Sequence, residues 1–300
     1  MTLEADLLLD RRRLKRRLTL WRVLAVVAFA GAIWAALPEG TASLDTAHVA
    51  RLDIRGTITD DRRVIAAIDR AATDTSIRAL IVAIDSPGGT VAGGEAIHAA
   101  LTRIAAVKPV VATMGATAAS AGYMVALPAA RIFAREGTLT GSIGVILQSF
   151  EASELLARLG VRPETIASGP LKDQPSPFRP LTEEGRAALT QVVQDMQAQF
   201  IRMVAAGRNM SEEAVRAIAD GRVMAGARAR DAGLVDAMGG EREARAWLAE
   251  ARQVPADLPI RGLETRPRLE RILASGTESL AQAFLTEWFG PGGLRAALPR

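Results

Sequence analysis

The sequence predicts an α/β protein in which a parallel sheet with flanking helices is followed by a helical C-terminal region and preceded by one N-terminal transmembrane helix. An apolar run at residues 23–37 follows a cluster of arginines. Short apolar runs then alternate with helical patterns, and from Leu181 onward the pattern is mostly helical. Alternation of strands and helices implies right-handed crossovers, and therefore a parallel sheet.

The first 22 residues carry the whole charge excess of the chain. They hold seven basic and three acidic residues, which leaves 30 of each in the remainder. A nucleic-acid-binding domain carries basic charge on its body, so this balance argues against nucleic acid as a partner.

The apolar run VLAVVAFAGAIWAAL at 23–37 has Trp21 just before it and Trp34 near its end. Extended back to residue 18, it reaches the roughly 20 residues that a spanning helix needs, and tryptophans suit the membrane interface. Arginines before a span keep the N-terminus cytoplasmic, so we expect the rest of the chain outside the cytoplasm. A cleaved secretory signal is the alternative.

We therefore divide the chain into five parts. They are a cytoplasmic basic tail (1–17), a transmembrane anchor (18–37), a linker (38–47), the main domain (48–265), and a C-terminal helical segment with a tail (266–300).

Within the main domain, the element at 79–84 is apolar throughout, as in a strand covered on both faces of its sheet. The other predicted strands are Val49–Ile54, Pro109–Met114, Arg131–Ala134 and Thr165–Ala167. The predicted helices are Gly93–Val107, Ala118–Leu127, Ala152–Leu159, one from Thr182 to about Ala206, and one capped by Ser211.

The composition excludes several kinds of chemistry. The chain has no cysteine, so a disulfide, a thiolate nucleophile and a cysteine-ligated metal are excluded. Two histidines, His48 and His98, are too few for a histidine-rich metal site, and we expect no metal or cofactor. His98 lies within a predicted helix among aliphatic residues and reads best as a partly buried helix residue.

A serine nucleophile is usually paired with a histidine or a lysine as its base, and the two histidines are poor candidates. Among 37 basic residues, only Lys15, Lys108 and Lys172 are lysines. A desolvated lysine can lose its proton, which an arginine cannot. Lys15 lies in the tail, and Lys108 reads as a solvated charge at a turn. Lys172 lies in a Gly/Pro loop, where the adjacent Asp173 would oppose proton loss if it touched the amine. In an extended segment Asp173 would face the opposite side.

The candidate nucleophile is Ser120, in the segment GATAASAGY. Its small neighbours would let a substrate backbone approach, and free N–H groups at a helix start can stabilise an oxyanion. Ser120 could also be a plain helix-start residue. The segment DSPGG at 85–89 follows a strand, and its glycines could turn backbone amides into a cavity or form a tight turn; it lacks the G-K-[ST] of a phosphate-binding loop.

Taken together, five segments resemble the signal peptide peptidase A (protease IV) family, in its short single-unit form, of the crotonase and Clp-protease superfamily. They are DSPGG at 85–89, MGATAASAGYMVA at 114–126, GTLTGSIGVI at 137–146, SGPLKDQPSPFRPLTEEGR at 168–186 and GRVMAGARARDAGLVDAMGG at 221–240. The resemblance implies a crotonase/Clp-protease-like fold and a membrane-anchored serine endopeptidase that degrades hydrophobic peptides such as cleaved signal peptides.

By this resemblance Ser120 is the nucleophile, Lys172 the general base, and Ser142 the hydroxyl that orients the lysine. The backbone amides of Gly88 or Gly89, with that of Ser120, would form the oxyanion hole. The family commonly has S-G-G-Y where this chain has Ser120-Ala121-Gly122-Tyr123, a small-for-small change. The resemblance also implies a homo-oligomeric ring whose active sites are shared between protomers, on the outer side of the inner membrane.

Two other readings stay open. A crotonase-type acyl-CoA enzyme would also use paired oxyanion amides, although acyl-CoA is chiefly cytoplasmic. The chain could also be an inactive, membrane-bound oligomeric scaffold, which would lack a reactive serine.

Overall fold

The computed structural model describes residues 17–27, 29 and 46–265. The chain divides into two units, residues 1–46 with 266–300 and residues 47–265, which are described separately. In the first unit, residues 17–27 and 29 are helical. Over the described residues, none of the helices has the length and hydropathy needed to cross a bilayer. The predicted anchor at 18–37 lies partly outside these residues, most of the linker lies outside them, and so does the whole C-terminal segment at 266–300.

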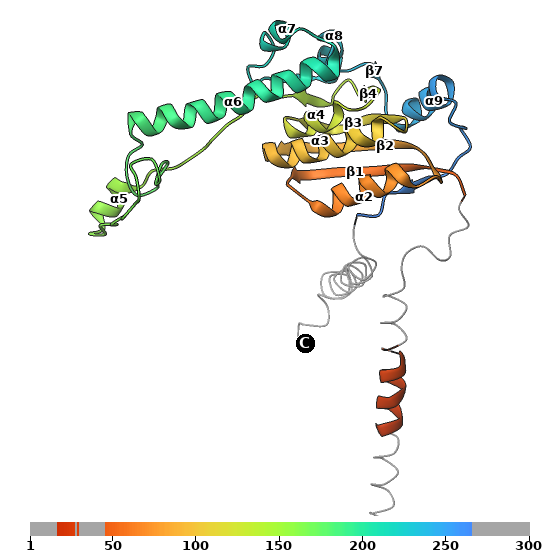
Figure 1. The fold of residues 1–300 in the computed structure, drawn as a ribbon, viewed down its shortest axis with the longest axis horizontal. Coiled ribbons are helices and arrows are strands. Elements are labelled where there is room, and N and C mark those ends of the chain that lie inside the picture. Colours follow the sequence, from red (N-terminus) through yellow and green to blue (C-terminus); the bar gives the residue numbers. More distant parts are fainter. Residues whose placement is uncertain (1–16, 28, 30–45, 266–300) are drawn as a thin grey trace, which may run out of the picture. The chain divides into compact units, whose positions relative to one another are not determined.

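The second unit contains an eight-stranded sheet (Figure 1). Its main path runs β6-β5-β3-β2-β1-β8, and β4 pairs with both β3 and β7. The strands are β1 (His48–Ile58), β2 (Ile77–Gly89), β3 (Val110–Ala119), β4 (Arg131–Ala134), β5 (Leu139–Gly141), β6 (Val223–Ala225), β7 (Ala237–Met238) and β8 (Ile260–Gly262).

All strand pairs are parallel except β5 with β6, which is antiparallel, so the prediction of a wholly parallel sheet was wrong at this edge. The helices are α2 (Arg62–Thr73), α3 (Val91–Ala105), α4 (Ala121–Ala126), α5 (Ser153–Arg158), α6 (Glu183–Arg208), α7 (Glu212–Arg216), α8 (Gly226–Asp231) and α9 (Glu241–Arg252). The α/β class is confirmed.

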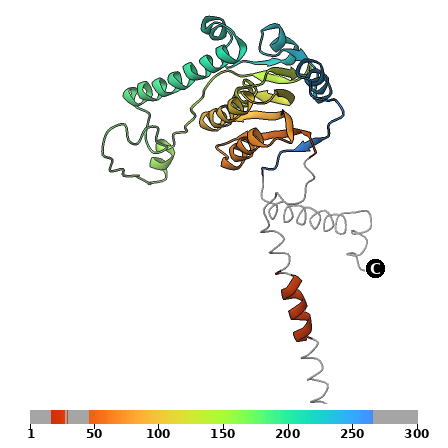
Figure 2. The same cartoon turned by 45° about the vertical axis from the view of Figure 1, so that its right-hand side comes forward.

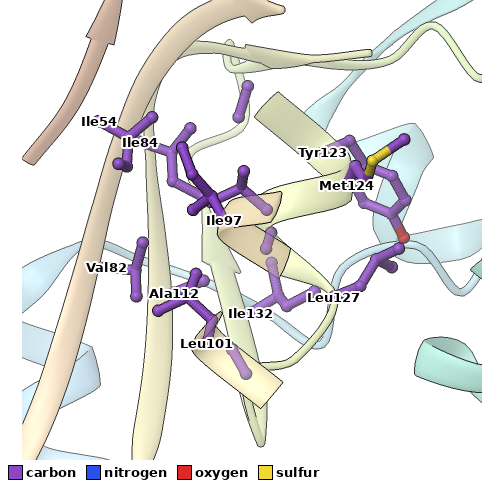
Figure 3. Packing of buried hydrophobic residues seen from close by; sticks show 14 of the residues in the cluster. Ile54, Val82, Ile84, Ile97, Leu101, Ala112, Tyr123, Met124, Leu127 and Ile132 are labelled. Carbon is purple, nitrogen blue, oxygen red and sulfur yellow. The ribbon is translucent and has the colours of Figure 1, made fainter. Parts of the chain in front are cut away.

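Helices cover the sheet on both faces, as the apolar character of 79–84 predicts. Leu80, Val82 and Ile84 belong to a core cluster that also contains residues of α2, α3 and α4. Figure 3 shows Val82 and Ile84 with residues of α3 and α4 from this cluster. Ala79 and Ile81, on the opposite face of β2, belong to a second cluster with residues of α9. Because successive strand residues point to opposite faces, one strand serves both layers of the core.

Several helices begin at the predicted capping residues. The side chain of Thr182 accepts a hydrogen bond from Gly185 N (3.0 Å), and that of Ser211 accepts one from Ala214 N (3.1 Å). Each bond satisfies an N–H group that would otherwise lack a partner in the first helical turn. The positions of α6 and α7 therefore follow from local sequence.

The segment between β5 and α6 extends away from the sheet (Figures 1 and 2). We call residues 146–182 the projecting segment. It contains α5, none of whose residues is buried, and it leads into α6, whose buried residues other than Gly185 lie at Phe200, Ile201 and Val204. The prediction of a strand at Thr165–Ala167 was wrong: the segment is irregular, and none of the strands that the structure describes pairs with it.

Candidate active site

Ser120 occupies a sharp turn between β3 and α4. It is the N-cap of α4, with φ 54° and ψ −122°, and its side chain makes no capping hydrogen bond. Its N–H donates to Gly141 O (2.9 Å), which ties the turn to the end of β5. A serine on a strained strand-to-helix turn keeps its hydroxyl available to a substrate, the arrangement that nucleophilic serines use in other folds.

Ser120 and Ser142 both have a strained backbone with positive φ that no helix end explains. Four non-glycine residues in the described chain have positive φ: Ser120, Ser142, Asn209 and Gln253. Asn209 and Gln253 are left-handed C-caps of α6 and α9, where such a conformation is common. Ser120 and Ser142 have no such explanation, and strain of this kind clusters at functional sites.

Ser142 lies beside Ser120. Ala119 at the end of β3 pairs with Gly141 at the end of β5, so Ser120 and Ser142 are the residues that follow this pair. Ser142 has φ 49°, and its N–H donates to Arg222 O (2.8 Å). The sheet therefore brings two of the predicted site residues to neighbouring strand ends.

The third component at this edge is Gly88, near the end of β2. A Cβ atom on Gly88 would lie 2.8 Å from Ser120 Cβ and 3.0 Å from Ala119 O, and its φ is +117°. Only glycine fits this position without displacing Ser120. The two segments singled out in the sequence, DSPGG and the one around Ser120, thus come into contact at Gly88 and Ser120.

The amides proposed for the oxyanion hole are largely engaged in this structure. Gly88 N donates to Ser86 Oγ (3.1 Å), and Ser120 N donates to Gly141 O. Gly89 packs on β1, where a Cβ atom would lie 1.9 Å from Ile58 O. The roles assigned to these three amides stay predictions.

The N–H of Ala121 is a donor that the sequence did not single out, although free N–H groups at a helix start were expected beside Ser120. Ala121 is the first residue of α4, so its N–H has no partner within the helix. The Ala121 N atom lies 3.3 Å from the position of a Cβ atom on Gly88, on the same side as Ser120. A helix starting directly after the nucleophile is the sequence signal that could have identified it.

Lys172 is exposed and lies on the projecting segment, in a turn where its N–H donates to Gly169 O (3.2 Å). Among the described residues, its amine makes no hydrogen bond or ion pair, and neither does the hydroxyl of Ser120. The structure therefore brings Ser120, Ser142 and Gly88 together, and among the residues it describes no hydrogen bond or ion pair joins the Lys172 amine to them.

The segment around Lys172 is a turn, so the expectation of an extended backbone was wrong. The Asp173 carboxylate instead meets Arg179, with Oδ2 of Asp173 2.8 Å from Nη2 of Arg179. The contact is an ion pair whose atoms are not aligned for a hydrogen bond to Oδ2.

The other candidate bases have structural roles. Lys108 Nζ donates to Ala71 O (2.7 Å) and to Asp74 O, at the end of α2. It precedes the start of β3, whereas Ser120 follows its end, and a ten-residue strand is about 33 Å long. Burial on α3 lowers the pKa of His98 against the opposing charge of Glu95, as suits a partly buried helix residue.

Two family models match the chain. The model described as Peptidase family S49 matches residues 102–255, and the Clp protease model matches residues 50–139. The second match agrees with the predicted Clp-protease-like fold.

Several curated proteins are similar to it. A Synechocystis protein named as a protease is 37% identical over 196 residues, which are 65% of this chain and 71% of that protein. A protein from Enterococcus faecium, named as the signal peptide peptidase SppA, is 34% identical over 170 residues (56% and 49%). Protease 4 of Salmonella typhi is 37% identical over 168 residues (55% and 27%).

The chain thus spans most of the first of these relatives, about half of the second and about a quarter of the third. The family match and the named relatives support a serine protease of the signal peptide peptidase A type. Because the family model covers more than half of its residues, the chain belongs to peptidase family S49.

Proposed function

We propose that the protein is a membrane-anchored serine endopeptidase that uses a Ser120/Lys172 dyad to degrade hydrophobic peptides such as cleaved signal peptides. The observation that carries this proposal is the strained turn at Ser120, with Gly88 and Ser142 against it. Family S49 membership supplies the reaction class, and the roles of Ser120, Lys172 and Ser142 rest on the resemblance of their segments to the family's motifs.

In this mechanism the neutral amine of Lys172 accepts the proton of the Ser120 hydroxyl as Oγ attacks the scissile carbonyl. In this proposal the oxyanion accepts hydrogen bonds from the N–H of Ala121 and from that of Gly89, or from that of Gly88 once it has left Ser86 Oγ. Lys172 then donates the proton to the leaving amine, and an acyl-enzyme remains on Ser120. Water, deprotonated by the same lysine, hydrolyses this ester and releases Ser120.

We further propose that Lys172 reaches Ser120 from a neighbouring protomer in a homo-oligomeric ring. The projecting segment exposes an unusual number of large apolar side chains, which a partner would cover. Those exposed by 40% or more are Ile146, Leu147, Phe150, Leu155, Leu159, Val161, Ile166, Leu171 and Phe178. A groove of about 550 Å³ beside α6 is lined by Ile146, Leu181 and Leu189 among others. In the proposed ring, this groove binds the exposed apolar side chains of the projecting segment of a second copy.

The proposed location is the inner membrane, with the N-terminus cytoplasmic and the peptidase domain on the other side. The support is the apolar run at 23–37 directly after the arginine cluster. In spheroplasts, added protease should digest the main domain and leave a short membrane-bound fragment. A main domain that stays protected in spheroplasts but is digested after lysis would contradict this topology.

The dyad is tested by conservative substitutions with matched controls. Ser120→Ala should abolish hydrolysis of a hydrophobic peptide ester, and Thr102→Ala, at an exposed hydroxyl on α3, should not. Lys172→Arg should abolish hydrolysis because a guanidinium does not lose its proton, whereas Lys108→Arg should leave it unchanged. Covalent labelling of Ser120 by an activated phosphonate is the direct readout.

Full activity in Ser120→Ala or Lys172→Arg would exclude the dyad. Absence of labelling under every condition would favour an inactive scaffold, and turnover of an enoyl-CoA would favour an acyl-CoA enzyme.

A further inference from the structure

The residue after the proposed base is an aspartate, and its position creates a problem for a lysine that must lose its proton. A carboxylate within about 4–6 Å favours the charged form of an amine. The side chains of adjacent residues in a turn can meet, because a lysine side chain is long and flexible. Asp173 could therefore hold Lys172 in its charged, inactive form unless something engages the carboxylate.

Arg179 engages it. Arg179 Nη2 lies 2.8 Å from Asp173 Oδ2 and 3.5 Å from Asp173 O, so the guanidinium closes on both the side chain and the main chain of Asp173. The side chains of Asp173 and Arg179 are 27% and 42% exposed, and Asp173 Oδ2 and Arg179 Nε are both shielded from solvent. An ion pair that is partly withdrawn from water is screened less than a fully exposed one.

The loop that carries the pair is held in place from both sides. The side chain of Gln174 packs on the first turn of α6, where a Cβ atom on Gly185 would lie 2.8 Å from Gln174 Oε1. Pro177 O accepts a hydrogen bond from Ala152 N (2.8 Å), and Ser176 is 3% exposed. Arg179 is thus presented to Asp173 by an anchored loop.

Other charged groups near this loop come from the elements packed against it. Glu151 and Arg186 line a cavity with Pro175 and Ser176, and Glu183 and Glu184 lie in the first turn of α6. Within the described part of the chain, none of them forms an ion pair with Lys172. Asp173 is the acid closest to Lys172 in sequence, and it is already paired.

We infer that Arg179 is a positioning residue that sequesters the Asp173 carboxylate, so that Lys172 can act as a neutral base. The inference rests on the proposed function of Lys172. The segment from Lys172 to Arg179 is then a functional unit, in which the positive charge of Arg179 offsets the negative charge of Asp173 that would otherwise favour the charged form of Lys172.

The test is the pH dependence of kcat/KM for hydrolysis of a hydrophobic peptide ester by the full-length protein. In Arg179→Gln the freed carboxylate should move the acidic limb of the profile about one pH unit towards higher pH, with little change in the alkaline plateau. Near neutral pH this shift appears as a loss of about tenfold.

Adding Asp173→Asn to Arg179→Gln should return the profile to that of the wild type, and Arg179→Lys should retain most of it. Arg103→Gln is the matched control, because Arg103 forms a similarly close ion pair with Asp69 (2.7 Å) elsewhere on the domain. This control should leave the profile unchanged.

The outcomes separate the inference from the proposed function. If Lys172→Arg is active, the dyad itself is wrong. If Lys172 is required but Arg179→Gln has the wild-type profile, the inference is wrong. A uniform loss at all pH values that Asp173→Asn does not rescue would show a structural role for Arg179 and would also overturn the inference.

Discussion

At Ser120 the backbone adopts a conformation that a serine rarely takes, at a cost on the order of 1–3 kcal/mol. The surrounding contacts stabilise it: Gly141 O accepts the Ser120 N–H, and Tyr123 N donates to Ser120 O (2.9 Å). Tyr123 is itself fixed, because its hydroxyl donates to Leu234 O (2.9 Å) in the core. A strained residue held from several sides is what a pre-organised nucleophile requires.

Gly88 provides the most direct test of this arrangement. Gly88→Ala places a methyl group 2.8 Å from Ser120 Cβ and imposes φ +117° on an alanine, so the turn must shift. We expect a loss of about 1–3 kcal/mol in the free energy of unfolding and a fall of at least about tenfold in phosphonate labelling of Ser120.

The control is Gly137→Ala, because nothing lies within 4 Å of its Cβ position. This variant should be labelled at the wild-type rate. Wild-type labelling of Gly88→Ala would mean that the nucleophile does not depend on this contact.

Between elements, a network of hydrogen bonds joins the end of α6 to the residues before β7. Arg208 Nη2 lies 2.6 Å from Asp236 Oδ1, Arg208 Nη1 lies 3.0 Å from Asp236 Oδ2, and Arg208 Nε donates to Gly233 O (2.8 Å). Asp236 Oδ2 also accepts from Ile132 N (2.7 Å), which connects the pair to β4. The Arg208 side chain is only 9% exposed.

Asp236 makes stability depend on pH in a defined direction. Burial raises the pKa of its carboxyl, but hydrogen bonds from Arg208 and Ile132 N outweigh burial and hold this pKa below its ordinary value. A carboxyl with a lowered folded-state pKa stabilises the fold above its unfolded-state pKa, about 3.9, and loses that contribution as the pH falls through the folded-state value.

Asp236→Asn should therefore cost about 3 kcal/mol at pH 7, at the lower end for a broken buried pair because Asp236 keeps 30% exposure. It should also flatten the loss of stability below about pH 4. Urea unfolding of wild type and variant at pH 7 and at acidic pH measures both effects. Asp69→Asn, at an exposed pair, should cost less than about 1 kcal/mol; an equal cost in both variants would contradict the special role of Asp236.

Length did not decide which elements could be predicted: the four-residue β4 and the six-residue α5 were predicted, whereas α2 and α9, with 12 residues each, were not. β1, β2, α3, β4 and α6 appear where apolar runs and capping residues place them. DSPGG was expected to form a loop, yet β2 continues through Gly89 because β1 extends beside it as far as Ile58. Strands of two or three residues such as β5, β6 and β7 carry too little periodicity to detect, and the antiparallel pairing of β6 depends on tertiary contacts.

The site shows the same division. Ser120, Gly88 and Ser142 meet because strand order and register place their segments at one edge, and motif order in the sequence was sufficient to select them. The separation of Lys172 from Ser120 within the chain could not be predicted from local sequence, because Lys172 lies on the projecting segment, which extends away from the sheet (Figures 1 and 2). The engagement of Asp173 by Arg179 spans six residues of irregular loop, for which no periodicity exists.

For the whole molecule, the proposed ring requires the exposed apolar side chains of the projecting segment to lie against a neighbouring protomer. Ile166 and Phe150 are 96% and 74% exposed. A glutamate at either site should destabilise the assembly, because the interface would bury its carboxylate without a partner, which is strongly unfavourable. Phe150→Glu with Ile166→Glu should therefore give monomers that remain folded and hydrolyse no peptide ester.

Size-exclusion chromatography with light scattering measures the change in mass. Val107→Glu is a matched control, since Val107 is also exposed (65%) but lies at the turn after α3. Monomers that retain full activity would show that one chain supplies a complete site.

Sharing of the site between protomers has a quantitative consequence when two inactive variants assemble together. If each site takes Ser120 from one protomer and Lys172 from the next, a ring made of Ser120→Ala and Lys172→Ala chains still contains intact sites. In equal, random mixing each partner is intact with probability one half, so about a quarter of the sites should be active. Co-expressed variants with two different affinity tags, purified through both tags, should therefore show about a quarter of the wild-type activity, whereas each variant alone shows none. If Ser120 and Lys172 of the same chain form the dyad, no mixture of these variants contains an intact site, and activity stays at zero at every mixing ratio.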